Sequence, residues 1–192
     1  PVAQESVWGD ASLGIFPSSR VSPEPDSIKR AAAALAAASL PIFVCGGGVV
    51  ISGAEQELAA LAQLLGAPVA TTVSGHASLA DDHPLSLGVV GSNGGTLPTR
   101  EALAQADLVV FVGCRAGSVT TERWRYPAPG TPVIHIDVDP NVIGANYETK
   151  VGLVGDAKLV LEALASHLKG SSSSRNGKAL VEKAKSQKFS AF

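Results

Sequence analysis

The chain has 192 residues, of which 45% are hydrophobic and 17% are charged, and its formal net charge is −2. This composition predicts one folded domain with tails and excludes a largely disordered chain. The sequence has no basic stripe to suggest nucleic-acid binding and no apolar run of membrane-spanning length. Two cysteines, Cys45 and Cys114, are too few for a disulfide framework, so we expect a reducing, cytoplasmic compartment.

The two ends of the chain differ from its middle. Residues 1–25 are rich in proline and lack periodic apolar positions, which predicts an extended interdomain connector. At the other end, residues 170–192 are predicted to be a C-terminal linker, with a flexible serine run at 171–174 and a solvated, basic amphipathic helix at 178–188. Because the chain opens with Pro1 and contains no methionine, we expect it to be a piece of a longer protein. The folded domain is then residues 26–169.

Short apolar runs alternate with helical patterns throughout the predicted domain. The first helix is Ala-rich, covers residues 27–39 and has Asp26 as its expected N-cap. A second helix opens on a capping box, Ser52 to Glu55, and ends at Gly66; a third covers about 97–106, and Asp156 caps the last. The predicted strands are residues 42–45, 68–73, 85–90, 108–112, 133–138 and 151–154. This alternation predicts a parallel sheet with helices on both faces.

The stretch FVCGGGVVISG, residues 43–53, places three glycines between a strand and a helix, as in many phosphate sites. The P-loop pattern fails, because Ala54 and Glu55 stand where it needs lysine and a hydroxyl residue. The dinucleotide fingerprint also fails, because Ile51 stands at its third glycine position. Two readings therefore stay open: an anion seat formed by Gly46, Gly47 and Gly48, or a tight turn that lets the helix pack on the sheet.

Other predicted strand ends also carry residues that suit a ligand. A parallel sheet binds its ligands at the carboxyl ends of its strands, so these residues should gather at one edge. Arg115 could clamp a phosphate, and Asp137 or Asp139 could accept ribose hydroxyls, although the same carboxylates could instead be the N-cap of a helix before Pro140, or serve in both ways. For Asp156 the helix cap is the favoured role. The remaining candidates stand at the end of the second strand: Thr72, Val73, Ser74 and Gly75.

We expect no catalytic residue and no metal site in this chain. The four histidines lack metal-ligand spacing, and no Gly-x-Ser-x-Gly motif is present. His135 lies in the middle of a predicted strand, where a satisfied, partly buried histidine is expected rather than a base. Cys45 and Cys114 each end a strand and are expected to be small core residues.

Three stretches resemble one known family, the central domain of thiamine-diphosphate-dependent enzymes, of which acetolactate synthase is the best-known type. They are PIFVCGGGVVISGAEQELAALAQLLGAPVATTVSGHASLADDHPLSLGVVG, ADLVVFVGCRAG and VIHIDVDPNVIGANYETKVGLVGDAKLVLEAL. The resemblance implies a three-layer α/β, Rossmann-like domain with six parallel strands in the order 3-2-1-4-5-6. It also implies a parent enzyme that acts on 2-keto acids by decarboxylation or carboligation.

In that family, thiamine diphosphate and Mg²⁺ are bound between flanking pyrimidine- and diphosphate-binding domains, in a homodimer or homotetramer. The family's Gly-Asp-Gly and Asn-Asn motif is absent from this sequence, so the resemblance implies that the chain alone is inactive. Central domains of this family hold FAD, ADP or nothing. Carried over, the nucleotide contacts would be Gly46, Gly47, Gly48, Thr72, Val73, Ser74, Gly75, Arg115, Asp137, Asp139 and Asp156. FAD-binding members carry His-Gly after the third strand, where this chain has Ser92-Asn93-Gly94.

Two alternatives remain open at this point. The chain could be an autonomous NAD- or FAD-binding module of sirtuin-like or electron-transfer-flavoprotein-like type, which predicts tight nucleotide binding. It could also be a purely structural spacer domain, which predicts none.

Overall fold

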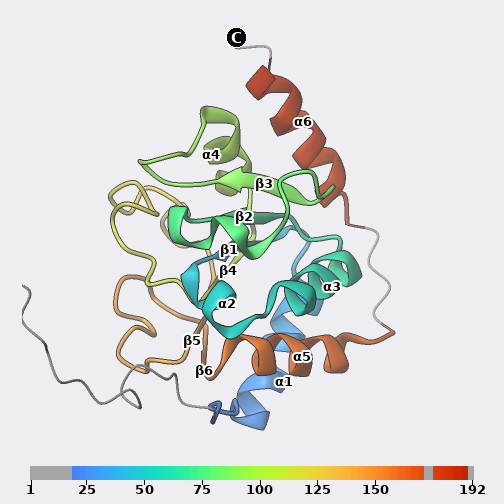
Figure 1. The fold of residues 1–192 in the computed structure, drawn as a ribbon, viewed down its shortest axis with the longest axis vertical. Coiled ribbons are helices and arrows are strands. Elements are labelled where there is room, and N and C mark those ends of the chain that lie inside the picture. The colour runs from blue at the N-terminus through green and yellow to red at the C-terminus, as the bar shows by residue number, and fades with distance from the viewer. Residues whose placement is uncertain (1–18, 171–174, 190–192) are drawn as a thin grey trace, which may run out of the picture.

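A computed structural model describes residues 19–170 and 175–189. Its centre is one parallel sheet of six strands in the order β3-β2-β1-β4-β5-β6, as predicted (Figure 1). The strands are β1 (Pro41–Cys45), β2 (Val69–Thr71), β3 (Ser86–Val89), β4 (Leu108–Val112), β5 (Val133–Asp137) and β6 (Val151–Val154). The helices are α1 (Pro25–Ala37), α2 (Gly47–Ser52), α3 (Glu55–Leu65), η2 (Val73–Ser78), α4 (Leu97–Ala104), α5 (Ala157–Leu168) and α6 (Gly177–Phe189).

The central strands are buried on both faces, which explains their continuous apolar runs. Side chains alternate along β1: Phe43 and Cys45 join one core cluster, and Ile42 and Val44 join the other. Helices α1, α3 and α5 cover the first face, while α4 and α6 cover the second (Figure 1). The chain therefore forms the three layers expected of a doubly wound α/β domain.

Two helix starts differ from the sequence predictions. Helix α1 begins at Pro25, and its N-cap is Glu24, whose carboxylate accepts hydrogen bonds from the amides of Asp26 and Ser27. The capping box is also wrong, because Ser52 is the last residue of α2 and its hydroxyl donates back to the carbonyl of Val49. The expected helix corresponds to α3, which begins later, at Glu55, and the short helix α2 before it, Gly47–Ser52, was not predicted.

The C-terminal helix α6 packs on the domain through one face. Val181 and Ala184 are buried in the second core cluster, and α6 contacts α4 and β3. The guanidinium of Arg175, just before α6, donates to carbonyls at the ends of both α1 and α3. Residues 175–184 are therefore part of the packed domain; that the tails join other domains stays a prediction. The serine run 171–174 and residues 1–18 of the predicted connector lie outside the described residues.

No helix within the described ranges is both long and apolar enough to span a bilayer.

Candidate functional site

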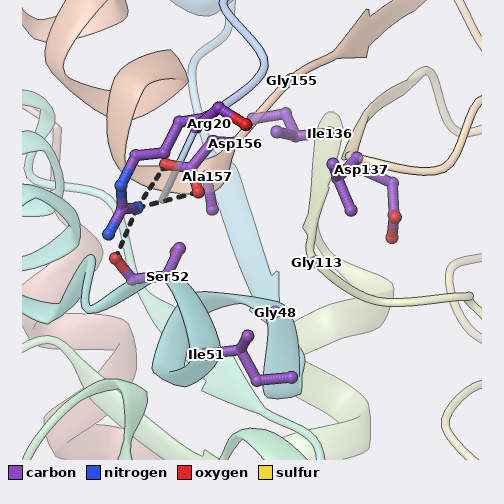
Figure 2. Close-up of a pocket in the computed structure, with 12 residues that line it drawn as sticks. Arg20, Gly48, Ile51, Ser52, Gly113, Ile136, Asp137, Gly155, Asp156 and Ala157 are labelled. Atoms are coloured by element: carbon purple, nitrogen blue, oxygen red, sulfur yellow. Dashed lines mark hydrogen bonds and ion pairs between the residues drawn. The ribbon is translucent and has the colours of Figure 1, made fainter. Parts of the chain in front are cut away.

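Two adjoining clefts open at the carboxyl ends of the strands. The first, here called the glycine cleft, has a volume of about 690 Å³ and lies over the ends of β1, β2 and β4. The second, the aspartate cleft, has a volume of about 590 Å³ and lies over the ends of β4, β5 and β6 (Figure 2). Gly48, Ile51 and Gly113 line both clefts, so the two meet where β1 and β4 pair. This is the topological switch point of the sheet, where open α/β sheets bind ligands.

The glycines after β1 interlock with the turn after β4. The amide of Gly46 donates to the carbonyl of Val112 at 2.9 Å, and the amide of Gly48 donates to the carbonyl of Gly113 at 3.1 Å. A β-carbon on Gly46 would lie 2.2 Å from the Gly113 oxygen, and one on Gly48 would lie 2.6 Å from the Gly113 α-carbon. Gly46 and Gly48 therefore serve backbone packing, and their amides are already used. Gly47 lines the glycine cleft and has no such close contact, its nearest neighbour being Ser74.

The turn after β2 is held by hydrogen bonds within the turn and to the end of β1. Thr72 caps η2 by accepting a hydrogen bond from the amide of Gly75, and its own amide donates to the carbonyl of Cys45 at 2.9 Å. A β-carbon on Gly75 would lie 2.2 Å from that same Cys45 oxygen, so Gly75 packs against β1 and lines neither cleft. Thr72, Val73 and Ser74 do line the glycine cleft. This turn therefore forms one wall of the cleft.

Arg115 supplies a cation to the glycine cleft. Its backbone is held because its carbonyl accepts a hydrogen bond from the side-chain amide of Asn146 at 2.9 Å. The side chain is exposed, and among the described residues no hydrogen bond or ion pair engages its guanidinium. An uncommitted guanidinium at a cleft rim suits an anionic ligand, which it can bind through two donors at once.

Asp137 and Asp139 have different roles in the turn after β5. Asp137 lines the aspartate cleft, and within the described part of the chain its carboxylate accepts a single hydrogen bond, from the amide of Asp139 to Oδ1. Asp139 lines neither cleft, and its Oδ1 accepts from both the amide and the side chain of Asn141. Asp139 thus stabilises a turn, and the helix that the alternative role required after Pro140 does not form. Asp137 keeps a carboxylate oxygen, Oδ2, that could accept a ligand hydroxyl.

Asp156 is the N-cap of α5, as predicted. Its Oδ1 accepts hydrogen bonds from the amides of Lys158 and Leu159, and both of its oxygens lie 2.8 Å from Nη1 of Arg20. Its carboxylate lines the aspartate cleft but is engaged by protein donors on each oxygen. Sequence reasoning missed Arg20, because no local pattern marks a partner 136 residues away. It also missed Ile51 and Asn146, whose positions at the clefts depend on the fold.

His135 and the two cysteines lie beneath the clefts. The Nε2 of His135 lies 2.8 Å from the carbonyl oxygen of Cys114, so this nitrogen carries the proton, while the buried Nδ1 has no partner among the described residues. Burial lowers the pKa of His135, which favours the neutral imidazole. Cys45 and Cys114 are buried free thiols in different core clusters. Within the described residues, no three His, Cys, Asp or Glu side chains gather as metal ligands.

We expect the buried Cys114 thiol to make the folded domain less stable at alkaline pH. Burial raises the pKa of Cys114 from 9.0 to about 11. The unfolded chain therefore ionises this thiol first, so its contribution to stability is intact below pH 9 and is lost as the pH rises toward 11. At 1.36 kcal/mol per pKa unit, the loss is about 2–3 kcal/mol. Urea unfolding of wild type and Cys114→Ala between pH 8 and 11 measures it. Equal pH-dependent losses in the two proteins would contradict this assignment.

Comparison with known proteins places this architecture among enzymes. Residues 28–164 match the family described as "Thiamine pyrophosphate enzyme, central domain". A probable acetolactate synthase large subunit from Methanocaldococcus jannaschii is 43% identical over 144 residues, which are 75% of this chain and 24% of that protein. An acetolactate synthase from Mycobacterium bovis is 37% identical over 147 residues, or 77% of this chain and 24% of the relative. The chain thus spans about a quarter of the length of these curated relatives.

Two solved enzyme structures share the fold of this chain. A putative thiamin diphosphate-dependent enzyme from Mycobacterium smegmatis superposes with a TM-score of 0.63 at 29% identity, covering 80% of this chain and 29% of that one. Benzoylformate decarboxylase from Polynucleobacter necessarius also superposes with a TM-score of 0.63, at 25% identity, covering 84% of this chain and 30% of that one.

Proposed function

Since this chain belongs to the thiamine pyrophosphate enzyme family as its central domain, we propose that it works as one part of a larger enzyme that acts on 2-keto acids. The observation that carries the proposal is its 43% identity to a probable acetolactate synthase large subunit, of which it covers 24%. The reaction class is decarboxylation or carboligation, in a cytoplasmic homodimer or homotetramer. Within that enzyme, this chain provides a nucleotide-binding site, here called the nucleotide seat, and a scaffold between the catalytic domains.

Thiamine diphosphate does not fit the residues of this chain. The cofactor's diphosphate needs a metal, and the described residues contain no carboxylate cluster that could hold one. The sequence also lacks the Gly-Asp-Gly and Asn-Asn motif. We therefore assign thiamine diphosphate and Mg²⁺ to the flanking domains and derive no catalytic step from the residues present here.

A turnover assay tests this assignment. The chain is incubated with thiamine diphosphate, Mg²⁺ and pyruvate, beside a longer polypeptide that includes this segment and both of the proposed flanking domains. We expect carbon dioxide release from the longer polypeptide alone, and only when thiamine diphosphate is present. Turnover by the short chain, or none by the longer polypeptide with any 2-keto acid tried, would contradict the proposal.

For the clefts, we propose an adenine nucleotide, with its phosphates at Gly47 and Arg115 and its ribose at Asp137. The uncommitted guanidinium of Arg115 and the free oxygen of Asp137 support this placement, since they suit a diphosphate and a hydroxyl, respectively. Ser92-Asn93-Gly94 replaces the His-Gly of the FAD-binding pattern, which favours ADP over FAD. Gly46, Gly48, Gly75, Asp139 and Asp156 act as structural supports of the seat.

Arg115→Ala is expected to weaken ADP binding about tenfold, or about 1.4 kcal/mol, because it removes the cation nearest the proposed diphosphate. Arg123→Ala is the matched control, since Arg123 is also exposed, lies eight positions further along the chain and lines neither cleft. Calorimetric titration with ADP gives both dissociation constants. An equal loss in the two variants would mean that only the net charge matters and that Arg115 is not a phosphate ligand.

A further inference from the structure

Residues 19–23, which precede α1, form one side of the aspartate cleft. Ser19 and Arg20 line that cleft. The amide of Asp156 donates to the carbonyl of Val21 at 2.9 Å, so this segment continues alongside the end of β6. It is also in close contact there, since a β-carbon on Gly155 would lie 3.2 Å from the nitrogen of Pro23.

One side chain fastens this segment to two other elements. Nη1 of Arg20 lies 2.8 Å from both carboxylate oxygens of Asp156, at the start of α5, and donates to the carbonyl of Ser52, the last residue of α2, also at 2.8 Å. Figure 2 shows the guanidinium bridging these two groups at the margin of the cleft. The Arg20 side chain is 41% exposed, whereas that of Asp156 is 14% exposed. An ion pair with one exposed partner is weak enough to open and close reversibly.

We propose that residues 19–23 are a strap that closes the side of the aspartate cleft, and that Arg20 is the latch that holds it on Asp156 and Ser52. When the latch opens, the backbone hydrogen bond from the amide of Asp156 to the carbonyl of Val21 still holds the strap. The cleft then opens toward the start of α5, where Ala157 is buried in its wall. The position of the chain upstream of α1 is thereby coupled to access to the cleft.

Limited trypsin digestion of the chain tests the latch, because trypsin cleaves after Arg20 only when the strap leaves the surface. Asp156→Asn removes the charge that holds Arg20 but keeps a residue that caps helices well, so α5 should persist. We expect cleavage between Arg20 and Val21, scored by mass spectrometry, to accelerate at least about tenfold, since the strap opens by local rather than global unfolding. Cleavage after Arg30, within α1, should not change.

Asp26→Asn is the matched control. It also removes an ion pair near the start of α1, the one between Asp26 and Lys29, but both of those side chains are largely exposed and neither touches the strap. It should leave cleavage after Arg20 at the wild-type rate. Equal rates in wild type and Asp156→Asn, or parallel acceleration after Arg20 and Arg30, would overturn the proposal.

Access to the aspartate cleft is measured separately, by the labelling rate of an introduced thiol. A thiol introduced as Ala157→Cys should react slowly with iodoacetamide, and several-fold faster when Asp156→Asn is added, because the open strap uncovers it. The native thiols are buried and should contribute little background. Equal labelling rates with and without Asp156→Asn would overturn the coupling between strap and cleft. Neither readout uses a nucleotide, so failure here and failure of the proposed nucleotide seat are distinguishable.

Discussion

Replacing Gly46 by alanine is expected to destabilise the domain by about 3 kcal/mol or more, the upper range for forcing an extra methyl group into packed structure. The new β-carbon would lie 2.2 Å from the carbonyl oxygen of Gly113 and 2.8 Å from the α-carbon of Cys114. Both neighbours are backbone atoms, so no side chain can rotate away. Relief would require β1 and β4 to separate where they pair, at the centre of the sheet.

Gly47→Ala is the matched control. The added β-carbon would meet its nearest atom, the carbonyl oxygen of Ser74, at an ordinary contact distance of 3.4 Å. Alanine favours the interior of a helix over glycine by up to about 1 kcal/mol, and this advantage is smaller at the first residue of α2. The substitution should therefore be neutral or slightly stabilising. Urea unfolding at pH 7 compares the two variants. If Gly46→Ala unfolds at the wild-type midpoint, the interlock of the two turns is not what requires glycine.

Arg175→Ala is expected to lower the free energy of unfolding by about 3 kcal/mol, since hydrogen bonds to charged groups contribute about 1.5–3 kcal/mol and several are lost together. The guanidinium donates to Leu35 and Ala38 at the end of α1 and to Leu65 at the end of α3, at 2.6, 2.8 and 3.2 Å. These carbonyls lie at helix ends, where the helix itself supplies no donor to them, and a cation there also interacts favourably with the helix dipole.

Arg175→Lys is the control, because an ammonium keeps the charge but cannot reach both helix ends with a fork of donors. It should recover less than half of the loss. Urea unfolding gives the stabilities, and hydrogen exchange should show faster opening at the last turns of α1 and α3. A loss below about 0.5 kcal/mol for Arg175→Ala would be the ordinary effect of a surface substitution and would contradict this role.

The sheet could be predicted from sequence because its strands carry local signals. β4 is continuously apolar and rich in β-branched residues, and β6 is followed after Gly155 by the helix cap Asp156, so their bounds match the prediction. β2 is shorter than expected, since Thr72 caps η2 instead of extending the strand. The capping-box pattern at Ser52 gave a wrong helix start. The pattern does not reveal that Gly53 is the C-cap of α2 and that Ala54 is the N-cap of α3.

The candidate site was only partly predictable. Sequence reasoning placed Arg115, Asp137 and the Gly47 turn at the cleft edge, because strand ends share an edge. It could not tell which glycines face a ligand and which face the neighbouring turn, because that depends on how closely β1 and β4 approach. It also could not find Arg20 or Arg175, which lie in the predicted tails and whose partners are more than 30 residues away in sequence.

Calorimetric titration of the wild-type chain with ADP, beside thiamine diphosphate with Mg²⁺, tests the central claim most directly. The account predicts that ADP binds with a dissociation constant near the micromolar range, about −8 kcal/mol, and that thiamine diphosphate gives no binding heat. No heat with millimolar ADP would mean that the clefts are not a nucleotide seat in this chain. Binding of thiamine diphosphate would mean that the cofactor was wrongly assigned to the flanking domains.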